Sequence, residues 1–346
     1  MIRSLDLGCG LKRPNTAFSP VNPGYCSDGQ PNHQYITFYQ QRISEEIGIS
    51  WIGNIAVLAD GGTTGSTAVF EKALPAICSL DEHATAVGGK IGVQLAYCAP
   101  STHRRRHWVS SSPEDAIKYH KNALLLVTDD TISSILNATL NAITNLAKRG
   151  ICIVQLHAAH GYFFHQLTSP LLNCRSGKYR FGSESIRKFL HCFSQAVPVA
   201  SVRLSISVSS HLRYSSSFDD QLALYRESGF RLIDLSYGIS WINKNDIYPR
   251  NPTQAMRAID FASSKKDGCT YIINGQITGE MIASHSSYNI IFGCGRSLIA
   301  DPQYFRKIRL GDYEKIHRCR LSGHCHYYTR NKAGIECPIS KFPWQH

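Results

Sequence analysis

The stretch Leu156-His157-Ala158-Ala159-His160-Gly161-Tyr162 decides how the chain is interpreted. An apolar run over residues 151–156 leads into it and is typical of a buried strand. Two imidazoles and a phenol follow where that strand should end. Because a barrel of parallel strands assembles its chemistry at the carboxyl ends of its strands, we interpret His157, His160 and Tyr162 as site residues. The competing interpretation is that each imidazole is a core histidine that hydrogen-bonds a backbone carbonyl, and the clustering of three such groups argues against it.

The rest of the chain alternates apolar strands with amphipathic helices, which is typical of βα units. We expect strands at 16–21, 49–58, 90–95, 151–156, 199–206, 231–236, 269–274 and 289–292. We expect helices at 35–46, 68–83, 128–149, 183–197, 218–228, 252–264, 280–285 and 302–308. Eight strands in 346 residues predict an α/β fold, a (β/α)8 TIM barrel that forms a single domain over residues 1–346.

Two segments depart from this rhythm. Residues 97–128 are rich in Pro, Ser, His and Arg and show no clear periodicity, which predicts an inserted loop over the site. Residues 311–346 follow the last expected helix and are interpreted as a C-terminal tail.

The formal net charge of +12 is concentrated in short clusters, Arg104-Arg105-Arg106 and Lys265-Lys266. Such charge could bind nucleic acid, an anionic membrane or an anionic ligand. No nucleic-acid motif accompanies it, so we interpret it as a solvated basic surface and expect neither a nucleic-acid nor a membrane partner. A homo-oligomer is possible.

Most of the 12 cysteines lie in apolar segments and are interpreted as small buried hydrophobic residues. The N-terminus lacks the apolar core of a signal peptide, and no run approaches the ~18 apolar residues of a membrane span. These features predict a reducing, cytoplasmic setting.

A glycine-rich segment, Gly293-Cys294-Gly295-Arg296, follows the last expected strand. Glycines let backbone N–H groups approach a phosphate closely, and the arginine adds a fixed cation. The loops after the seventh and eighth strands often bind phosphate in this barrel, and Asn274-Gly275 ends the seventh strand. We therefore predict a phosphate site here.

Two polar residues interrupt apolar strands. The amide of Gln94 can both donate and accept, which suits the edge of a heteroaromatic ring. Arg203 would be costly to bury without an anion. Pairing with a core carboxylate is one interpretation of Arg203, and a cofactor contact is the one we favour.

These residues resemble a known family. The stretch 156–162, followed by Gln166-Leu167-Thr168-Ser169-Pro170 and Asn173-Cys174-Arg175, resembles the old yellow enzyme family of FMN-dependent ene-reductases. Further matches lie in register at 52–54, 62–65, 89–95, 202–205, 295–296 and 300–302. The resemblance covers roughly residues 11–338.

The resemblance implies FMN at the barrel mouth and NAD(P)H as reductant. It implies that Gln94 and Arg203 contact the isoalloxazine, and that Asn22 lies near a flavin carbonyl. The other implied cofactor contacts are Pro20 and Gly53, with Asn274, Gly275, Gly295 and Arg296 towards the phosphate. On the substrate side, His157 and His160 would hydrogen-bond a carbonyl or nitro oxygen, Tyr162 would protonate the α-carbon, and Tyr25 and Tyr97 would add contacts.

We therefore expect an FMN-dependent oxidoreductase that reduces an activated C=C bond in a small enone-like substrate. One alternative keeps FMN but carries out dehydrogenation, isomerisation or cyclisation in specialised-metabolite biosynthesis. A further alternative is a non-catalytic flavin-binding relative, against which the intact His157, His160 and Tyr162 argue.

The chain departs from the family in three places, the first being Tyr97, where the family often has His. The loop 175–183 lacks the family's aspartate. Long relatives carry four cysteines that ligate a cluster, whereas here Cys319, Cys325 and Cys337 have no fourth partner. Zinc held with His317 or His324 is an alternative, but we expect a tail without metal.

Overall fold

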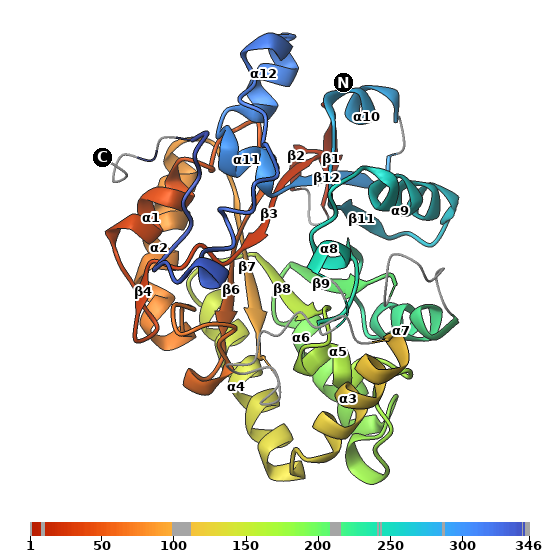
Figure 1. Cartoon of the computed structure of the whole chain (residues 1–346). Helices are drawn as coiled ribbons and strands as arrows, with labels where there is room; N and C mark the ends of the chain where they lie inside the picture. Colours follow the sequence, from red (N-terminus) through yellow and green to blue (C-terminus); the bar gives the residue numbers. More distant parts are fainter. Residues whose placement is uncertain are drawn as a thin grey trace.

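Eight parallel strands close into a barrel in the computed structural model, which describes residues 2–7, 11–98, 112–207, 216–240, 242, 244–285, 288–340 and 342. In spatial order they are β10 (Leu232–Ser236), β11 (Thr270–Ile273), β12 (Ile290–Cys294), β3 (Thr16–Val21), β6 (Ile49–Ala56), β7 (Ile91–Ala96), β8 (Ile153–Ala158) and β9 (Val199–Ser205). Parallel pairing of β12 with β3, Phe292 opposite Thr16, closes the ring (Figure 1). The predicted (β/α)8 barrel is confirmed.

Helices surround the strands, as Figure 1 shows. They are α1 (His33–Gln40), α2 (Phe70–Ala86), α4 (Asp129–Ala147), α6 (Glu184–Gln195), α7 (Ser216–Glu227), α9 (Thr253–Ser264), α10 (Gly279–Ser284) and α12 (Tyr304–Leu310). Several begin at side-chain caps, because the hydroxyls of Thr128, Ser183 and Thr278 accept the amide hydrogens that open α4, α6 and α10. The expected final helix over 302–308 corresponds to α12, and a short helix that was not expected, α11 (Arg296–Ala300), ends before Pro302.

A short hairpin lies at the amino-terminal end of the barrel, where sequence patterning gave no strand. It consists of β1 (Ser4–Asp6) and β2 (Lys12–Pro14). Leu5, Leu7 and Leu11 pack against an apolar cluster that includes Trp51 and Ile153 from the strands. The hairpin therefore helps to seal that end of the barrel, and the site forms at the opposite end.

The segment 97–128 is not a loop throughout. Residues 113–125 form α3 (Pro113–Leu125), with Ser112 as N-cap and Pro113 in the first turn. The helix buries Ala116, His120 and Leu124, a spacing of four that the surrounding polar residues obscured. Residues 99–111, with the Arg104-Arg105-Arg106 cluster, lie outside the described residues.

The C-terminal segment packs against the loops that follow β3. Gly334 forms a bridge with Gly24, and the Ile335 amide donates to the Pro23 carbonyl at 2.8 Å. It contains the short turns η4 (Tyr313–Lys315) and η5 (Tyr327–Arg330). In Figure 1 this dark-blue segment runs back beside α1 and β3. The predicted tail is thus part of the wall around the site end of the barrel.

Within the described ranges, no single helix has both the length and the apolar character to span a bilayer. Only α3 and α4 taken together meet the criterion, and they are bent by 92° relative to each other.

Candidate active site

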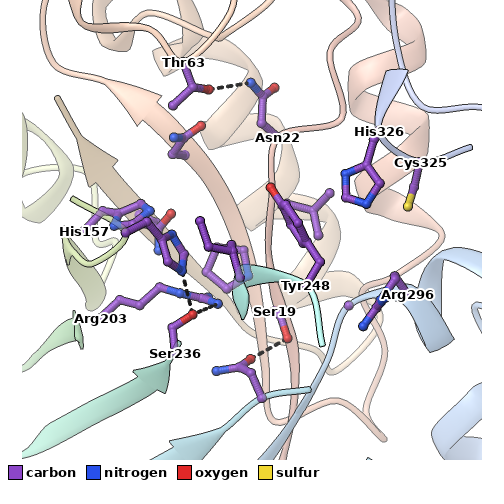
Figure 2. Close-up of a pocket in the computed structure, with 18 of the residues that line it drawn as sticks. Ser19, Asn22, Thr63, His157, Arg203, Ser236, Tyr248, Arg296, Cys325 and His326 are labelled. Atoms are coloured by element: carbon purple, nitrogen blue, oxygen red, sulfur yellow. Dashed lines mark hydrogen bonds between the residues drawn. The ribbon is translucent and has the colours of Figure 1, made fainter. Parts of the chain in front are cut away.

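A cavity of about 1100 Å³, open solvent at its mouth included, lies at the carboxyl ends of the barrel strands (Figure 2). This is the size range of pockets for small molecules and cofactors. Of the residues that sequence analysis selected, the structure gathers here Pro20, Asn22, Gln94, His157, His160, Tyr162, Arg203, Asn274, Gly275, Gly295 and Arg296. These residues come from six different strands or the loops that follow them, so the barrel brings together residues that are far apart in the sequence.

Three selected residues do not line the cavity. Tyr25 is buried, and its hydroxyl donates to the Ile335 carbonyl of the C-terminal segment. The hydroxyl of Tyr97 donates to Asp60 at 2.9 Å, and its ring packs on Phe163. Gly53 lies in β6 with its backbone bound to the Tyr39 hydroxyl. Substrate contacts by the two tyrosines are therefore not supported, because both hydroxyls are used in packing the loops.

Sequence analysis missed several lining residues, among them Ser19, Asn54, Ser236 and Tyr248, and residues 325–328 and Ile335 of the C-terminal segment. Ser236 ends a strand, so its position alone could have selected it. The C-terminal residues gave no such signal, because only tertiary packing brings them over the barrel.

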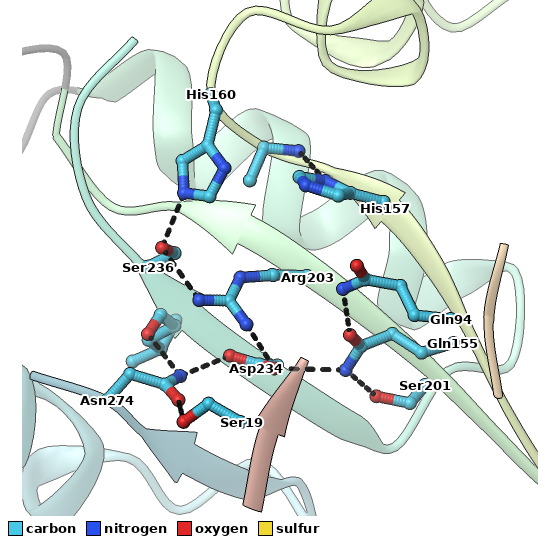
Figure 3. Close-up of polar contacts among 12 residues, drawn as sticks. Ser19, Gln94, Gln155, His157, His160, Ser201, Arg203, Asp234, Ser236 and Asn274 are labelled. Atoms are coloured by element: carbon cyan, nitrogen blue, oxygen red, sulfur yellow. Dashed lines mark hydrogen bonds and ion pairs between the residues drawn. The ribbon is translucent and has the colours of Figure 1, made fainter. Parts of the chain in front are cut away.

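A buried ion pair lies beneath the cavity floor (Figure 3). Arg203 on β9 contacts the carboxylate of Asp234 on β10 at 3.3 Å, and the Asp234 side chain is fully buried. Burial raises the pKa of Asp234, whereas Arg203 and the hydrogen bonds to the carboxylate oppose the rise. Arg203 therefore pairs with a core carboxylate, as one interpretation held, and also lines the cavity.

Amides extend this pair into a network across the barrel. The Gln155 amide donates to Asp234 at 3.1 Å and accepts from Gln94 at 2.6 Å. The Asn274 amide donates to the second Asp234 oxygen at 2.5 Å and accepts from Ser19 at 2.6 Å. Figure 3 shows the chain of contacts from β3 to β7. The network fixes Gln94, Arg203 and Asn274 at the floor of the cavity.

The tautomer of His157 follows from its backbone contact. Its Nδ1 accepts the Ala159 amide hydrogen at 3.3 Å. A neutral imidazole that accepts at Nδ1 carries its proton on Nε2. We therefore assign Nε2 of His157 as a hydrogen-bond donor in the cavity.

His160 is oriented by Ser236. Its Nε2 lies 2.7 Å from the Ser236 hydroxyl, to which Arg203 also donates at 3.2 Å. Because a guanidinium only donates, the serine oxygen accepts from Arg203 and its hydrogen is available for His160 Nε2. We assign the remaining proton of His160 to Nδ1. The backbone of His160 is left-handed, with φ +62°, a conformation costly for a residue with a Cβ and often found at functional sites.

Tyr162 completes the group. Its ring centroid lies 5.0 Å from that of His157 and 6.1 Å from that of His160, and the two imidazole centroids are 5.1 Å apart. The three rings meet edge to face. Sequence clustering thus predicted a real cluster of two imidazoles and a phenol in one cavity.

The two imidazoles are neutral at physiological pH. Burial is the main cause that lowers the pKa of His157 and of His160 well below 6.5, and the nearby Arg203 guanidinium lowers both further. The folded protein therefore favours the uncharged form. Above about pH 6.5, the pKa of histidine in the unfolded chain, this preference contributes its full amount to the free energy of unfolding. Below that pH, the free energy of unfolding falls by about 1.4 kcal/mol per pH unit for each histidine.

For the FMN-dependent reaction that the sequence resemblance implies, we expect the rate at which substrate reoxidises the reduced flavin to stay level as the pH falls from about 8 through about 6.5. Neither imidazole then changes charge, so the donors described above persist. Stopped-flow measurement of flavin reoxidation across this range would test the expectation. An inflection near pH 6.5 that disappears in His157→Ala or His160→Ala would contradict it.

Asn22 lines the cavity but uses its polar atoms locally. Its Nδ2 donates to Thr67 at 2.9 Å and to Thr63 at 3.3 Å, and its Oδ1 accepts from the Gly24 amide. Thr64, beside this group, lies 3.2 Å from the Tyr327 hydroxyl of the C-terminal segment. Asn22 thus ties the loop after β3 to residues 63–67, and Thr64 in turn contacts the C-terminal segment.

Two buried polar atoms of the cavity have no hydrogen-bond partner among the described residues and suit the polar groups of a flavin. Within the described ranges, Nε of Arg203 and Oδ1 of Asn54 are buried and have no partner. A buried donor and a buried acceptor without partners are costly, and they complement the carbonyl and N–H groups of an isoalloxazine.

The opposite end of the cavity fits a phosphate. A Cβ added at Gly295 would meet no atom of the described residues closer than the Ser19 side chain at 3.7 Å. None of these residues therefore fills the space beside Gly295, and this space is part of the cavity. Arg296 follows directly, and its guanidinium donates to the Pro249 carbonyl. Gly275, at φ +123°, exposes backbone on the other side.

The three cysteines of the C-terminal segment lie around a second cavity that adjoins the first at Arg296. No group of three or more His, Cys, Asp and Glu side chains in the described part of the chain could hold a metal ion. The sulfurs of Cys319 and Cys337 accept the Leu321 and Ser340 amides. The zinc alternative thus finds no ligand set among these residues.

Known proteins resemble this chain in sequence and in fold. A family model described as "NADH:flavin oxidoreductase / NADH oxidase family" matches residues 17–315. An "NADPH dehydrogenase" of Bacillus pumilus (strain SAFR-032) is 24% identical over 294 residues, which are 82% of this chain and 85% of that protein.

A solved structure titled "2-Naphthoyl-CoA Reductase-2-Naphthoyl-CoA complex" matches with a TM-score of 0.77 at 14% identity. The match covers 98% of this chain and 56% of that one, so this chain spans little more than half the length of that reductase. At this identity the match supports the barrel fold alone.

Proposed function

Because the chain belongs to the NADH:flavin oxidoreductase / NADH oxidase family and is thus an FMN-dependent NAD(P)H oxidoreductase, we propose that it reduces an activated C=C bond. The substrate class is a small molecule in which the double bond is conjugated to a carbonyl or a similar group. The observation that carries the proposal is the cluster of His157, His160 and Tyr162 in one cavity with the flavin-complementary atoms of Arg203 and Asn54.

The two imidazoles bind and polarise the carbonyl oxygen. Nε2 of His157 and Nδ1 of His160 carry their protons, so two neutral donors are available to one acceptor in the cavity. Negative charge develops on that oxygen as the β-carbon is reduced, and fixed donors in a buried site stabilise such charge strongly. Because neither ring is charged, both bind the ketone without attracting a competing anion.

Bound FMN supplies a hydride equivalent after reduction by NAD(P)H. Tyr162 holds the proton that completes the reaction, donating it to the α-carbon as the enolate collapses to the saturated ketone. Its phenolate then regains a proton from water. Overall, the C=C π bond is replaced by two C–H bonds, one formed from hydride and the other from the phenol proton.

The cavity floor would hold and orient the cofactor. Gln94 and Arg203 are fixed by the Asp234 network, and Asn54 presents an acceptor beside them. Arg296 and the backbone of Gly275 and Gly295 would hold the phosphate. The isoalloxazine would thus meet the preorganised groups of the floor, and the phosphate would meet a cation at the opposite end of the cavity.

We expect Arg296→Ala to weaken FMN retention about 10- to 100-fold, because a charge-assisted contact to a phosphate contributes about 1.5–3 kcal/mol. The ratio of flavin absorbance to protein absorbance after dialysis against increasing salt measures the loss. Arg306→Ala is the matched control, since Arg306 is exposed on α12 and does not line the cavity. Equal retention in both variants would remove Arg296 from the phosphate site.

The proposal is tested by anaerobic reoxidation. The NADPH-reduced enzyme is mixed with a cyclic enone, a nitroalkene and, as a control, the saturated ketone that matches the enone. We expect the first two to restore the oxidised flavin spectrum and yield the saturated product, and the third to do nothing. Failure of every conjugated acceptor, with NADPH still reducing the flavin, would refute C=C reduction.

A further inference from the structure

A buried histidine on α3 contacts the turn that carries two of the proposed site residues. We propose that His120 is a positioning residue, which locks residues 160–162 so that His160 and Tyr162 face the cavity. This inference rests on the proposed function for the roles of those two residues. His120 lies in the segment that sequence analysis interpreted as a loop, and its side chain is fully buried.

Hydrogen bonds connect His120 to both sides of the turn. Its Nε2 lies 3.2 Å from the Ser240 carbonyl, and the Ser240 amide donates to the His160 carbonyl at 2.9 Å. On the other side, the Gln166 amide donates to the Gly161 carbonyl and to His120 Nδ1, each at 2.9 Å. The contacts form a closed ring through His120, Ser240, His160, Gly161 and Gln166.

The ring is chemically consistent with one tautomer only. Gln166 must donate to the Gly161 carbonyl, so the same nitrogen donates to His120 Nδ1, which accepts. The proton of His120 is then on Nε2, where it donates to the Ser240 carbonyl. The neutral imidazole satisfies both contacts, and burial, which lowers the pKa of His120 to about 4, keeps it neutral.

Packing restricts the turn further. A Cβ added at Gly161 would lie 2.5 Å from Cε1 of His120, so the imidazole fills the space beside the turn. Gly161 has φ +76° and His160 φ +62°, two successive left-handed residues. Such a conformation persists only where the surroundings hold it, and the imidazole ring of His120 is a large part of those surroundings.

The proposed chemistry needs that restraint. Tyr162 follows the two left-handed residues directly, and its ring must stay beside the imidazoles, 5.0 Å from His157. A displacement of about 1 Å in a reacting group can cost about 100-fold in rate. Loss of the His120 contacts would therefore act on the step that uses Tyr162, with little effect on reduction of the flavin.

The experiment compares His120→Ala with Leu124→Ala in the FMN-loaded enzyme. Leu124 lies one turn further along α3, is fully buried and takes no side-chain part in the ring. Its truncation should destabilise the protein by about 2–5 kcal/mol, so it controls for general loosening of α3. His120→Asn, which can keep an acceptor for Gln166, should restore part of the function.

We expect His120→Ala to slow reoxidation by an enone about 10- to 100-fold while reduction by NADPH is unchanged. Amide hydrogen exchange in residues 159–167 should speed up in the same variant, and Leu124→Ala should change neither the rate nor this local exchange. If the two variants behave alike, or if both half-reactions slow equally, His120 is not a positioning residue.

A second variant and a second measurement test the role of His120 if the first variant does not fold or if the proposed function fails. If His120→Ala does not fold, Gln166→Met removes the amide that donates to both His120 and Gly161, and it should give the same selective slowing. If the wild-type enzyme reduces no conjugated substrate, the proposed function fails, whereas local exchange in residues 159–167 still reports whether His120 holds the turn.

Discussion

Replacement of Tyr162 by phenylalanine should slow reoxidation of the reduced flavin by an enone about 100- to 10,000-fold, the range typical of a lost general acid. Reduction of the flavin by NADPH should be unchanged, because no proton from Tyr162 enters that half-reaction. Stopped-flow absorbance measures both halves separately. The solvent deuterium isotope effect on reoxidation should also change, since the phenol proton exchanges with water.

A matched control is available in Tyr304. The Tyr304 phenol is buried and donates to the Ile277 carbonyl at 3.0 Å, and it lies on α12 and does not line the cavity. Tyr304→Phe should leave both half-reactions unchanged. If Tyr162→Phe slows the two halves equally, the phenol affects flavin binding and is not the acid.

The barrel could be predicted because each of its strands can be recognised from a short stretch of neighbouring residues. Each strand is an apolar run bounded by turn residues, and the expected first strand, 16–21, coincides with β3. The expected strand at 151–156 begins two residues early, since β8 runs from Ile153 to Ala158 and includes His157. The imidazole thus lies within the strand, where alternation points it to the cavity.

What sequence reasoning missed depends on distant packing. Asp234 lies in the apolar run of β10, and nothing near it in sequence shows that Arg203 is its partner, 31 positions away. Likewise, His120 contacts the turn at Gly161 only because α3 packs against that turn, which the sequence around His120 does not show. The resemblance implied substrate contacts for Tyr25 and Tyr97, but the two hydroxyls bind Ile335 and Asp60 of neighbouring segments.

Asp234 is a position where a single change should cost much of the stability. We expect Asp234→Asn to lower the free energy of unfolding by about 3–5 kcal/mol, because it leaves Arg203 buried without a counter-charge. The new amide cannot satisfy the site in either orientation. One carboxylate oxygen accepts from Gln155 and Arg203 and the other from Asn274, so an NH2 group at either position faces a donor.

Chemical denaturation of the FMN-loaded protein measures this cost, and Asp219→Asn is its control. Asp219 lies 3.7 Å from Lys265 with its side chain about half exposed, an ion pair of the kind that contributes about 0–1 kcal/mol. A loss below about 1 kcal/mol in Asp234→Asn would mean that the buried pair does not hold the floor of the cavity. The same variant should slow enone reduction, because Arg203 positions Ser236 and through it His160. Stability and rate would then fall together, since one buried carboxylate fixes both the core of the barrel and the orientation of a substrate-binding imidazole.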